Sequence, residues 1–165
     1  MIRKAGLKDV RPIYRLIRHW AQKDYLLGRS LSDICDNLRD FFVSERDGEV
    51  LGCGALHITW LDLAEIRSVA VAEEHLRRGV GGALVETCIG EARALEVPRL
   101  FTLTYMPEFF ERFGFKRMPK EAFPHKIWTV CINCPHYPDC DEVVMALDLD
   151  AGAGTDHRGQ EPQLE

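Results

Sequence analysis

The residues of this sequence whose types and spacing best suit chemistry form a basic, glycine-rich turn. Two arginines and three glycines fall within six consecutive positions, which are Arg77, Arg78, Gly79, Val80, Gly81 and Gly82. A helix N-terminus carries unbonded amides and partial positive charge, and glycines there let the backbone approach an anion closely. The pattern predicts a phosphate-binding turn that leads into a helix. The alternative is a tight strand-to-helix connection that binds nothing.

Two familiar nucleotide-binding motifs do not fit this turn. No Gly-Lys-Ser or Gly-Lys-Thr follows it, as a P-loop would require. The run Gly79, Val80, Gly81 also lacks the third glycine of a dinucleotide-binding fingerprint. A bound phosphate would therefore belong to a ligand held in another way.

A second group of residues suited to chemistry consists of soft metal ligands near the C-terminus. Cys131, Cys134 and Cys140, with His136 between them, lie within ten positions. Zinc prefers thiolate and imidazole ligands, but this spacing differs from common zinc-finger patterns. The group predicts either a small zinc site or reduced thiols in a loop. We expect buried thiols, without structural disulfides, for the other three cysteines, Cys35, Cys53 and Cys88.

Apolar periodicity predicts the elements that must position these residues. The expected helices lie at 10–23, from Ser30 onward, at 81–95 and at 107–113. The expected strands lie at 2–4, 41–45, 50–59, 64–71, 100–104, 115–117 and 143–149. Asp9 and Ser30 are the expected N-caps of the first two helices. This order of elements predicts a mixed α/β fold around one sheet.

Composition limits the classes of partner. The 165 residues carry a net charge of -5, so there is no overall basic field for nucleic acid or an anionic membrane. No apolar run reaches the roughly 20 residues of a bilayer span, and no secretory signal is evident. We expect one cytoplasmic domain at 1–150, a disordered tail at 151–165 and small-molecule ligands. Edge strands near the C-terminus could pair in a homodimer.

The glycine-rich turn, taken with residues 65–71 and 108–115 (EIRSVAV and EFFERFGF), resembles the pyrophosphate loop of the GNAT superfamily of N-acetyltransferases. The resemblance implies a central, mostly antiparallel sheet flanked by helices, with one parallel strand pair that splays apart. It also implies that residues 77–82 hold the pyrophosphate of acetyl-CoA. The thioester-pantetheine arm would pair with Val69, Ala70 and Val71. The family loop usually begins with Gln or Arg where this sequence has Leu76.

Further stretches are similar to the short, single-domain bacterial N-acetylglutamate synthases. They are GRS at 28–30, GCGALH at 52–57, AEIRS at 64–68, LTY at 103–105, PHKIW at 124–128 and CINC at 131–134. The resemblance implies acetyl transfer from acetyl-CoA to the α-amino group of L-glutamate, the first step of arginine biosynthesis. Glutamine, aspartate, a peptide N-terminus or a lysine are alternative acceptors. A sensor that binds acyl-CoA or an amino acid without turnover is an alternative of another class.

Acetyl transfer to an amine needs a base, because an ammonium cannot attack a thioester. The resemblance implies that Glu65 is this base and that a main-chain amide at 69–71 meets the oxyanion. Many family members supply a tyrosine that protonates the leaving thiolate, but the matching residue here is Phe110. Tyr105 is the nearest alternative donor, and its other interpretation is a packed loop aromatic.

An acidic amino acid brings two carboxylates, which call for cationic partners in a cleft. Arg29, Arg67 and Lys126 are the candidates, since each lies in a stretch that matches the short synthases. The alternative for each one is an ordinary solvated surface residue.

Overall fold

The computed structural model describes residues 1–122 and 142–149 of the chain, and within these ranges the strands form one mixed sheet. Its order is β1-β2-β3-β4-β5-β7-β6. The strands are β1 Ile2–Lys4, β2 Phe41–Arg46, β3 Glu49–Trp60, β4 Leu63–Val71, β5 Arg99–Thr104, β6 Lys116–Arg117 and β7 Val143–Asp148. The helices are α1 Val10–Ala21, α2 Leu31–Asp36, α3 Val80–Ala94 and α4 Pro107–Glu111. Short 3-10 turns are η1 Leu7–Asp9, η2 Leu38–Asp40, η3 Glu73–His75 and η4 Lys120–Ala122.

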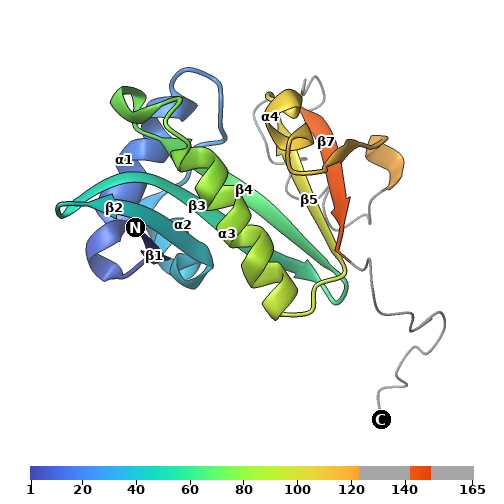
Figure 1. Cartoon of the computed structure of the whole chain (residues 1–165). Coiled ribbons are helices and arrows are strands. Elements are labelled where there is room, and N and C mark those ends of the chain that lie inside the picture. Colours follow the sequence, from blue (N-terminus) through green and yellow to red (C-terminus); the bar gives the residue numbers. More distant parts are fainter. Residues whose placement is uncertain (123–141, 150–165) are drawn as a thin grey trace, which may run out of the picture.

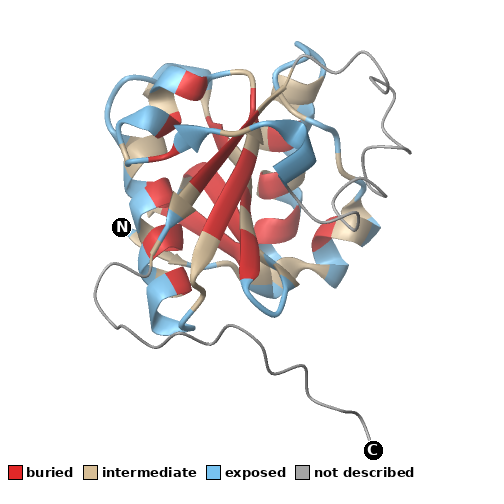
Figure 2. Ribbon diagram, turned by 90° about the vertical axis from the view of Figure 1, so that its right-hand side faces the viewer, coloured by how far each residue is buried: buried red, intermediate tan, exposed pale blue. Residues whose placement is uncertain are grey.

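Helices cover both faces of the sheet, because alternate strand residues are apolar on opposite sides. Phe41 packs with α1 and α2, whereas its neighbour Phe42 packs with α3. On the first side Ile13, Ile17 and Ile34 are fully buried. Full burial of each such side chain stabilises the fold by about 1.5–3 kcal/mol. Figure 2 shows the buried residues gathered on the strands and on the helix surfaces turned toward them.

The β2–β3 hairpin confirms its prediction from sequence. Its turn places Asp47 at φ 51° and Gly48 at φ 80°, which is the left-handed pair of a type I′ turn. Such turns match the right-handed twist of the flanking strands. The hairpin fixes the register of β3 against β2, and β3 in turn pairs with β4.

One parallel pair, β4 with β5, interrupts the antiparallel sheet. The two strands are in register only from Leu63 opposite Arg99 to Glu65 opposite Phe101. Figure 1 shows them close together at one end and apart at the other, with β7 and α4 beside β5. The predicted mostly antiparallel sheet with one splayed parallel pair is therefore confirmed.

Two local expectations were wrong, whereas others were confirmed. Ser30 caps α2, since its Oγ accepts a 3.0 Å hydrogen bond from the amide of Asp33. Asp9 makes no such cap, because its buried carboxylate accepts hydrogen bonds from Arg3, which lower its pKa. Cys35 is exposed rather than buried. Two other thiols are free and buried as expected, those of Cys53 and Cys88.

Candidate active site

The predicted phosphate-binding turn joins the end of β4 to the N-terminus of α3. Arg77 and Gly79 both adopt positive φ, at 61° and 81°, so the backbone reverses sharply before Val80 begins the helix. Arg77, Arg78 and Gly79 are exposed. Neither arginine forms an ion pair with any residue at 1–122 or 142–149. The turn therefore offers free cationic side chains at the N-terminus of a 15-residue helix.

The first turn of α3 lies close to α4. A Cβ at Gly81 would meet the rings of Phe109 and the side chain of Val71 at 3.5 Å, and one at Gly82 would meet Phe113 at 3.4 Å. These are ordinary contact distances, so glycine lets backbone and rings approach closely. By contrast, none of the described residues lies within 4 Å of a Cβ at Gly79. The predicted pyrophosphate segment is packed on its α4 side and open at Gly79.

A β-bulge redirects β4 just before the predicted pantetheine segment. Cys53 lies opposite Ala70 and Ala55 opposite Arg67, so two residues of β4 oppose one of β3. One of the two, Ser68, has φ 56°, and its carbonyl accepts a hydrogen bond from the Cys53 thiol. The bulge bends β4 where it has already parted from β5.

The edge of β4 that faces away from β3 has no partner strand at 66–71 within the described residues. Val69, Ala70 and Val71 lie on this stretch, with Ala70 and Val71 buried. A strand edge without a partner presents backbone donors and acceptors that an extended ligand can pair with. Apart from the Val71 carbonyl, which accepts a 2.8 Å hydrogen bond from Nε1 of Trp20, the described structure leaves the predicted segment open to an extended ligand.

Glu65 is the last residue of β4 that pairs with β5, and it lies on the same face as Arg67 two positions later. Both side chains are partly buried. Arg29, in the loop before α2, is only 11% exposed and donates a 3.0 Å hydrogen bond to Asp33. We call Glu65, Arg67, Arg29 and Asp33, with the pair described next, the polar cluster. It unites three of the residues predicted from sequence.

A pair that the sequence did not predict completes the polar cluster. Nδ1 of His57 lies 2.7 Å from Oδ2 of Asp40, and both side chains are partly buried. His57 stands directly opposite Glu65 in the β3·β4 register. The alternation of side chains along β3 could have predicted that His57 lies on this face. No residue close to Asp40 in the sequence, however, indicates that His57 is its partner.

The electrostatics of the polar cluster follow from its burial. Burial raises the pKa of Glu65, and the nearby charges of Arg67, Arg29 and His57 act in the opposite direction. Burial also lowers the pKa of Arg67, and the neighbouring charge of Arg29 lowers it further. Nε of Arg67 is buried and lacks a hydrogen-bond partner in the described part of the chain. A carboxyl with a raised pKa beside an unsatisfied guanidinium is suited to proton transfer next to an anion site.

A surface hollow adjoins the polar cluster at Arg29. It has a volume of about 360 Å³ and lies between α1 and the loop before α2. Its lining residues are Tyr14, Arg18, Ala21, Gln22, Gly28 and Arg29. Two of the six are arginines, so the hollow favours an anionic occupant.

Phe110 and Tyr105 occupy different surroundings. Phe110 is 6% exposed, with its ring centroid 5.1 Å from that of Phe109 and 5.4 Å from that of Phe115. A phenylalanine therefore suits this buried, apolar position. Tyr105 directly follows β5 and is partly buried. It stays a candidate donor at the open end of the β4/β5 pair.

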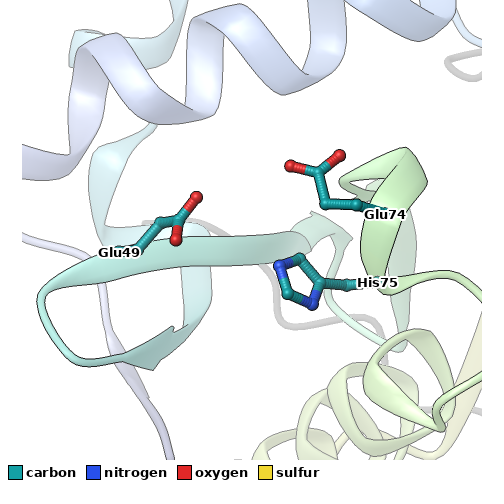
Figure 3. Close-up of side chains that lie close together, drawn as sticks. All are labelled: Glu49, Glu74 and His75. Atoms are coloured by element: carbon teal, nitrogen blue, oxygen red, sulfur yellow. The ribbon is translucent and has the colours of Figure 1, made fainter.

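Several predicted residues lie outside the described ranges. They are Lys126 and the candidate zinc ligands Cys131, Cys134, His136 and Cys140. A different potential metal-binding group is seen where η3 meets the start of β3. The ligand atoms of Glu49, Glu74 and His75 lie within 4.8 Å of one another (Figure 3). Both carboxylates are exposed, and such groups are common without a metal.

Comparison with known proteins decides the family. The model of the acetyltransferase (GNAT) family matches residues 7–115, which include the turn, β4 and the whole polar cluster. The chain belongs to the GNAT acetyltransferase family. The GNAT fold predicted from the glycine-rich turn is thereby confirmed.

Two relatives of this GNAT protein are 41% identical to it. An uncharacterized N-acetyltransferase of Chlorobaculum tepidum matches over 148 residues, which are 90% of this chain and 96% of the relative. An amino-acid acetyltransferase of Mycobacterium tuberculosis matches over 118 residues, 70% of this chain and 67% of the relative. Similarity of this extent supports a shared fold and a shared general chemistry.

A solved structure extends the comparison. N-acetylglutamate synthase from Neisseria gonorrhoeae, complexed with coenzyme A and N-acetyl-glutamate, matches with a TM-score of 0.80 at 27% identity. The match covers 90% of this GNAT chain and 35% of the synthase. The chain thus spans about a third of that protein's length.

None of the helices at 1–122 and 142–149 combines the length and apolarity needed to cross a membrane.

Proposed function

We propose that this GNAT protein transfers the acetyl group of acetyl-CoA to the α-amino group of L-glutamate. One observation carries the proposal: Glu65, with a pKa raised by burial, lies beside Arg67 and Arg29 where β4 parts from β5. The amino-acid acetyltransferase relatives and the synthase solved with N-acetyl-glutamate support it. The step would be the first of arginine biosynthesis, carried out in the cytoplasm on small-molecule substrates.

Acetyl-CoA fits the turn and the free edge of β4. Arg77 and Arg78 would neutralise its pyrophosphate, together with the amides at Gly79, Val80, Gly81 and Gly82. The pantetheine arm would pair with the edge of β4 at Val69, Ala70 and Val71. Acetyl-CoA supplies the activated thioester. Leu76, which is 43% exposed, cannot donate a hydrogen bond to phosphate, so the backbone and the two arginines would hold it.

Glu65 would remove the proton that keeps the acceptor amine from attacking. A base works best when its pKa lies near the operating pH, and burial shifts Glu65 upward in that direction. The positive charges of Arg67 and Arg29 limit this shift, so the carboxylate form remains accessible. Glu65 can therefore both accept a proton and release it again.

The acceptor's carboxylates would be bound by guanidinium groups. Within the described residues the Nε of Arg67 is buried without a hydrogen-bond partner, and an acceptor carboxylate would satisfy it. Arg29 borders the hollow beside α1, and its bond to Asp33 holds the guanidinium in place. Lys126, outside the described residues, is proposed as a third cation. Tyr105 is proposed as the proton donor to the leaving thiolate.

Product identification tests this function. The protein would be incubated with acetyl-CoA and an equimolar mixture of the twenty amino acids, and the acetylated products would be identified by mass spectrometry. N-acetylglutamate as the dominant product supports the proposal. If N-acetylglutamine or N-acetylaspartate dominates, glutamine or aspartate is the acceptor instead of glutamate. If no amino acid is acetylated, a peptide acetyltransferase or a non-catalytic sensor is favoured.

A further inference from the structure

The pair formed by His57 and Asp40 is not among the residues assigned to acetyl transfer above. Asp40 ends η2 directly before β2, and His57 lies near the end of β3, so two separate segments build the contact. Their atoms Nδ1 and Oδ2 are 2.7 Å apart. The side chains are 33% and 26% exposed, which leaves the imidazole partly open to solvent. An oriented imidazole at the rim of a polar cluster is suited to exchange protons with water.

The register of the sheet connects this pair to the proposed base. Directly opposed residues on antiparallel strands project from the same face, with Cβ atoms about 4.5–5.5 Å apart. His57 and Glu65 are such a pair. No direct hydrogen bond joins them in the described structure, so a proton would cross through a water or after a side-chain rotation.

The contact with Asp40 determines what the imidazole can do. A carboxylate can only accept, so Nδ1 of His57 donates its hydrogen to Asp40. Nε2 is then left to take up a proton, and the Asp40 carboxylate stabilises the imidazolium that results. Asp40 thus fixes both the tautomer and the orientation of the ring.

We propose that His57, positioned by Asp40, relays the proton from Glu65 to solvent, an inference that rests on the proposed acetyl transfer. The acceptor ammonium gives one proton to the Glu65 carboxylate and becomes a neutral amine. The Glu65 carboxyl then passes this proton to Nε2 of His57 and is a carboxylate again. The imidazolium finally releases it to water, so that one proton leaves the site for each amine activated.

The charged groups that face the proposed relay come from several elements. Arg67 from β4 and Arg29 from the loop before α2 are the cations near Glu65, and Asp40 contacts the imidazole directly. Asp33 on α2 and Glu142 before β7 add further negative charges near the site. Charges of both signs therefore surround the proposed path of the proton.

Three substitutions in the full-length chain test the relay. His57→Ala removes it, Asp40→Asn removes the charge that orients it, and Asp36→Asn is the matched control at an exposed position of α2. We expect kcat for the acceptor to fall about 10-fold to 100-fold in the first two, within the range of a proton-transfer group. The affinity for CoA, measured by calorimetry, should stay the same in all three.

Chemical rescue separates a relay from a merely structural role. Added imidazole should restore much of the kcat of His57→Ala, because it can carry the proton in place of the ring.

The outcomes also separate this inference from the proposed function. If wild-type protein shows no acceptor-dependent thiol release, acetyl transfer itself fails. If wild-type protein is active but His57→Ala keeps its kcat, or loses it without imidazole rescue, the relay is overturned while acetyl transfer stands.

Discussion

The hydroxyl of Thr102 donates a 2.8 Å hydrogen bond to the carbonyl of Ile66, just where β4 stops pairing with β5. Thr102 is 2% exposed and lies on β5, whose other edge pairs with β7. One side chain thus satisfies a backbone acceptor of β4 at the point where the strand ladder can no longer reach it. The splay that opens the candidate site begins at a defined contact.

Thr102→Val should destabilise the fold by about 1–3 kcal/mol, because it removes the donor and leaves the Ile66 carbonyl buried and unsatisfied. Urea unfolding of both proteins measures the difference. Thr102→Ser keeps the hydroxyl and should therefore lose less stability than Thr102→Val. Equal stability of Thr102→Val and wild type would show that this bond does not hold the strands where they part.

Glu65→Gln should raise thermal stability more at neutral pH than at low pH. The pKa of Glu65 is higher in the folded chain than in the unfolded one, because burial disfavours the carboxylate. Stability from such a group is present below the unfolded pKa and is lost as the pH rises through the folded pKa. Melting curves from about pH 4 to about pH 7 test this. A stability gain from Glu65→Gln that increases toward low pH would contradict this prediction.

Arg67→Met should raise the KM for glutamate about 10-fold to 100-fold, because a buried guanidinium donor to a carboxylate is lost. The KM for acetyl-CoA should change little. Arg93→Met, at an exposed position in the last turn of α3, is the matched control. Steady-state kinetics with each substrate varied in turn would reveal the split. Equal increases in the KM for glutamate and the KM for acetyl-CoA would show that Arg67 does not bind the acceptor.

Two glycine substitutions should have opposite effects on stability. A Cβ at Gly52 would lie 3.0 Å from the Val80 side chain and 3.1 Å from the carbonyl of Ala70, so Gly52→Ala should cost about 1–3 kcal/mol. A Cβ at Gly90, inside α3, would meet no atom of the described residues within 4 Å, so Gly90→Ala should stabilise the fold by about 0.5–1 kcal/mol. Chemical denaturation compares them. A stable Gly52→Ala would mean that α3 lies less closely on β3.

Local signals in the sequence were enough to predict most elements and the glycine-rich turn between β4 and α3. The apolar spacing of α3, the Asp47 and Gly48 turn and the Ser30 cap all depend on residues close in the chain, and all were confirmed. Asp9 occupies the predicted N-cap position of α1, but its side chain does not cap the helix, because its carboxylate binds a tertiary partner, Arg3.

The polar cluster shows what sequence could not supply. Its members come from the loop before α2, from α2, from η2 and from β3 and β4, and only the sheet register brings them together. Glu65, Arg67 and Arg29 were predicted through a family resemblance. Asp40 and His57 were not, because their contact spans 17 positions and depends on how β2 and β3 pair.

Thiol release from acetyl-CoA with L-glutamate, compared between wild type and Glu65→Gln, tests the central claim most directly. Wild-type protein should release thiol in proportion to glutamate, and Glu65→Gln should lower kcat about 100-fold or more while the Kd for CoA stays the same. Absence of glutamate-dependent release from wild type, or an undiminished kcat in Glu65→Gln, would contradict the account.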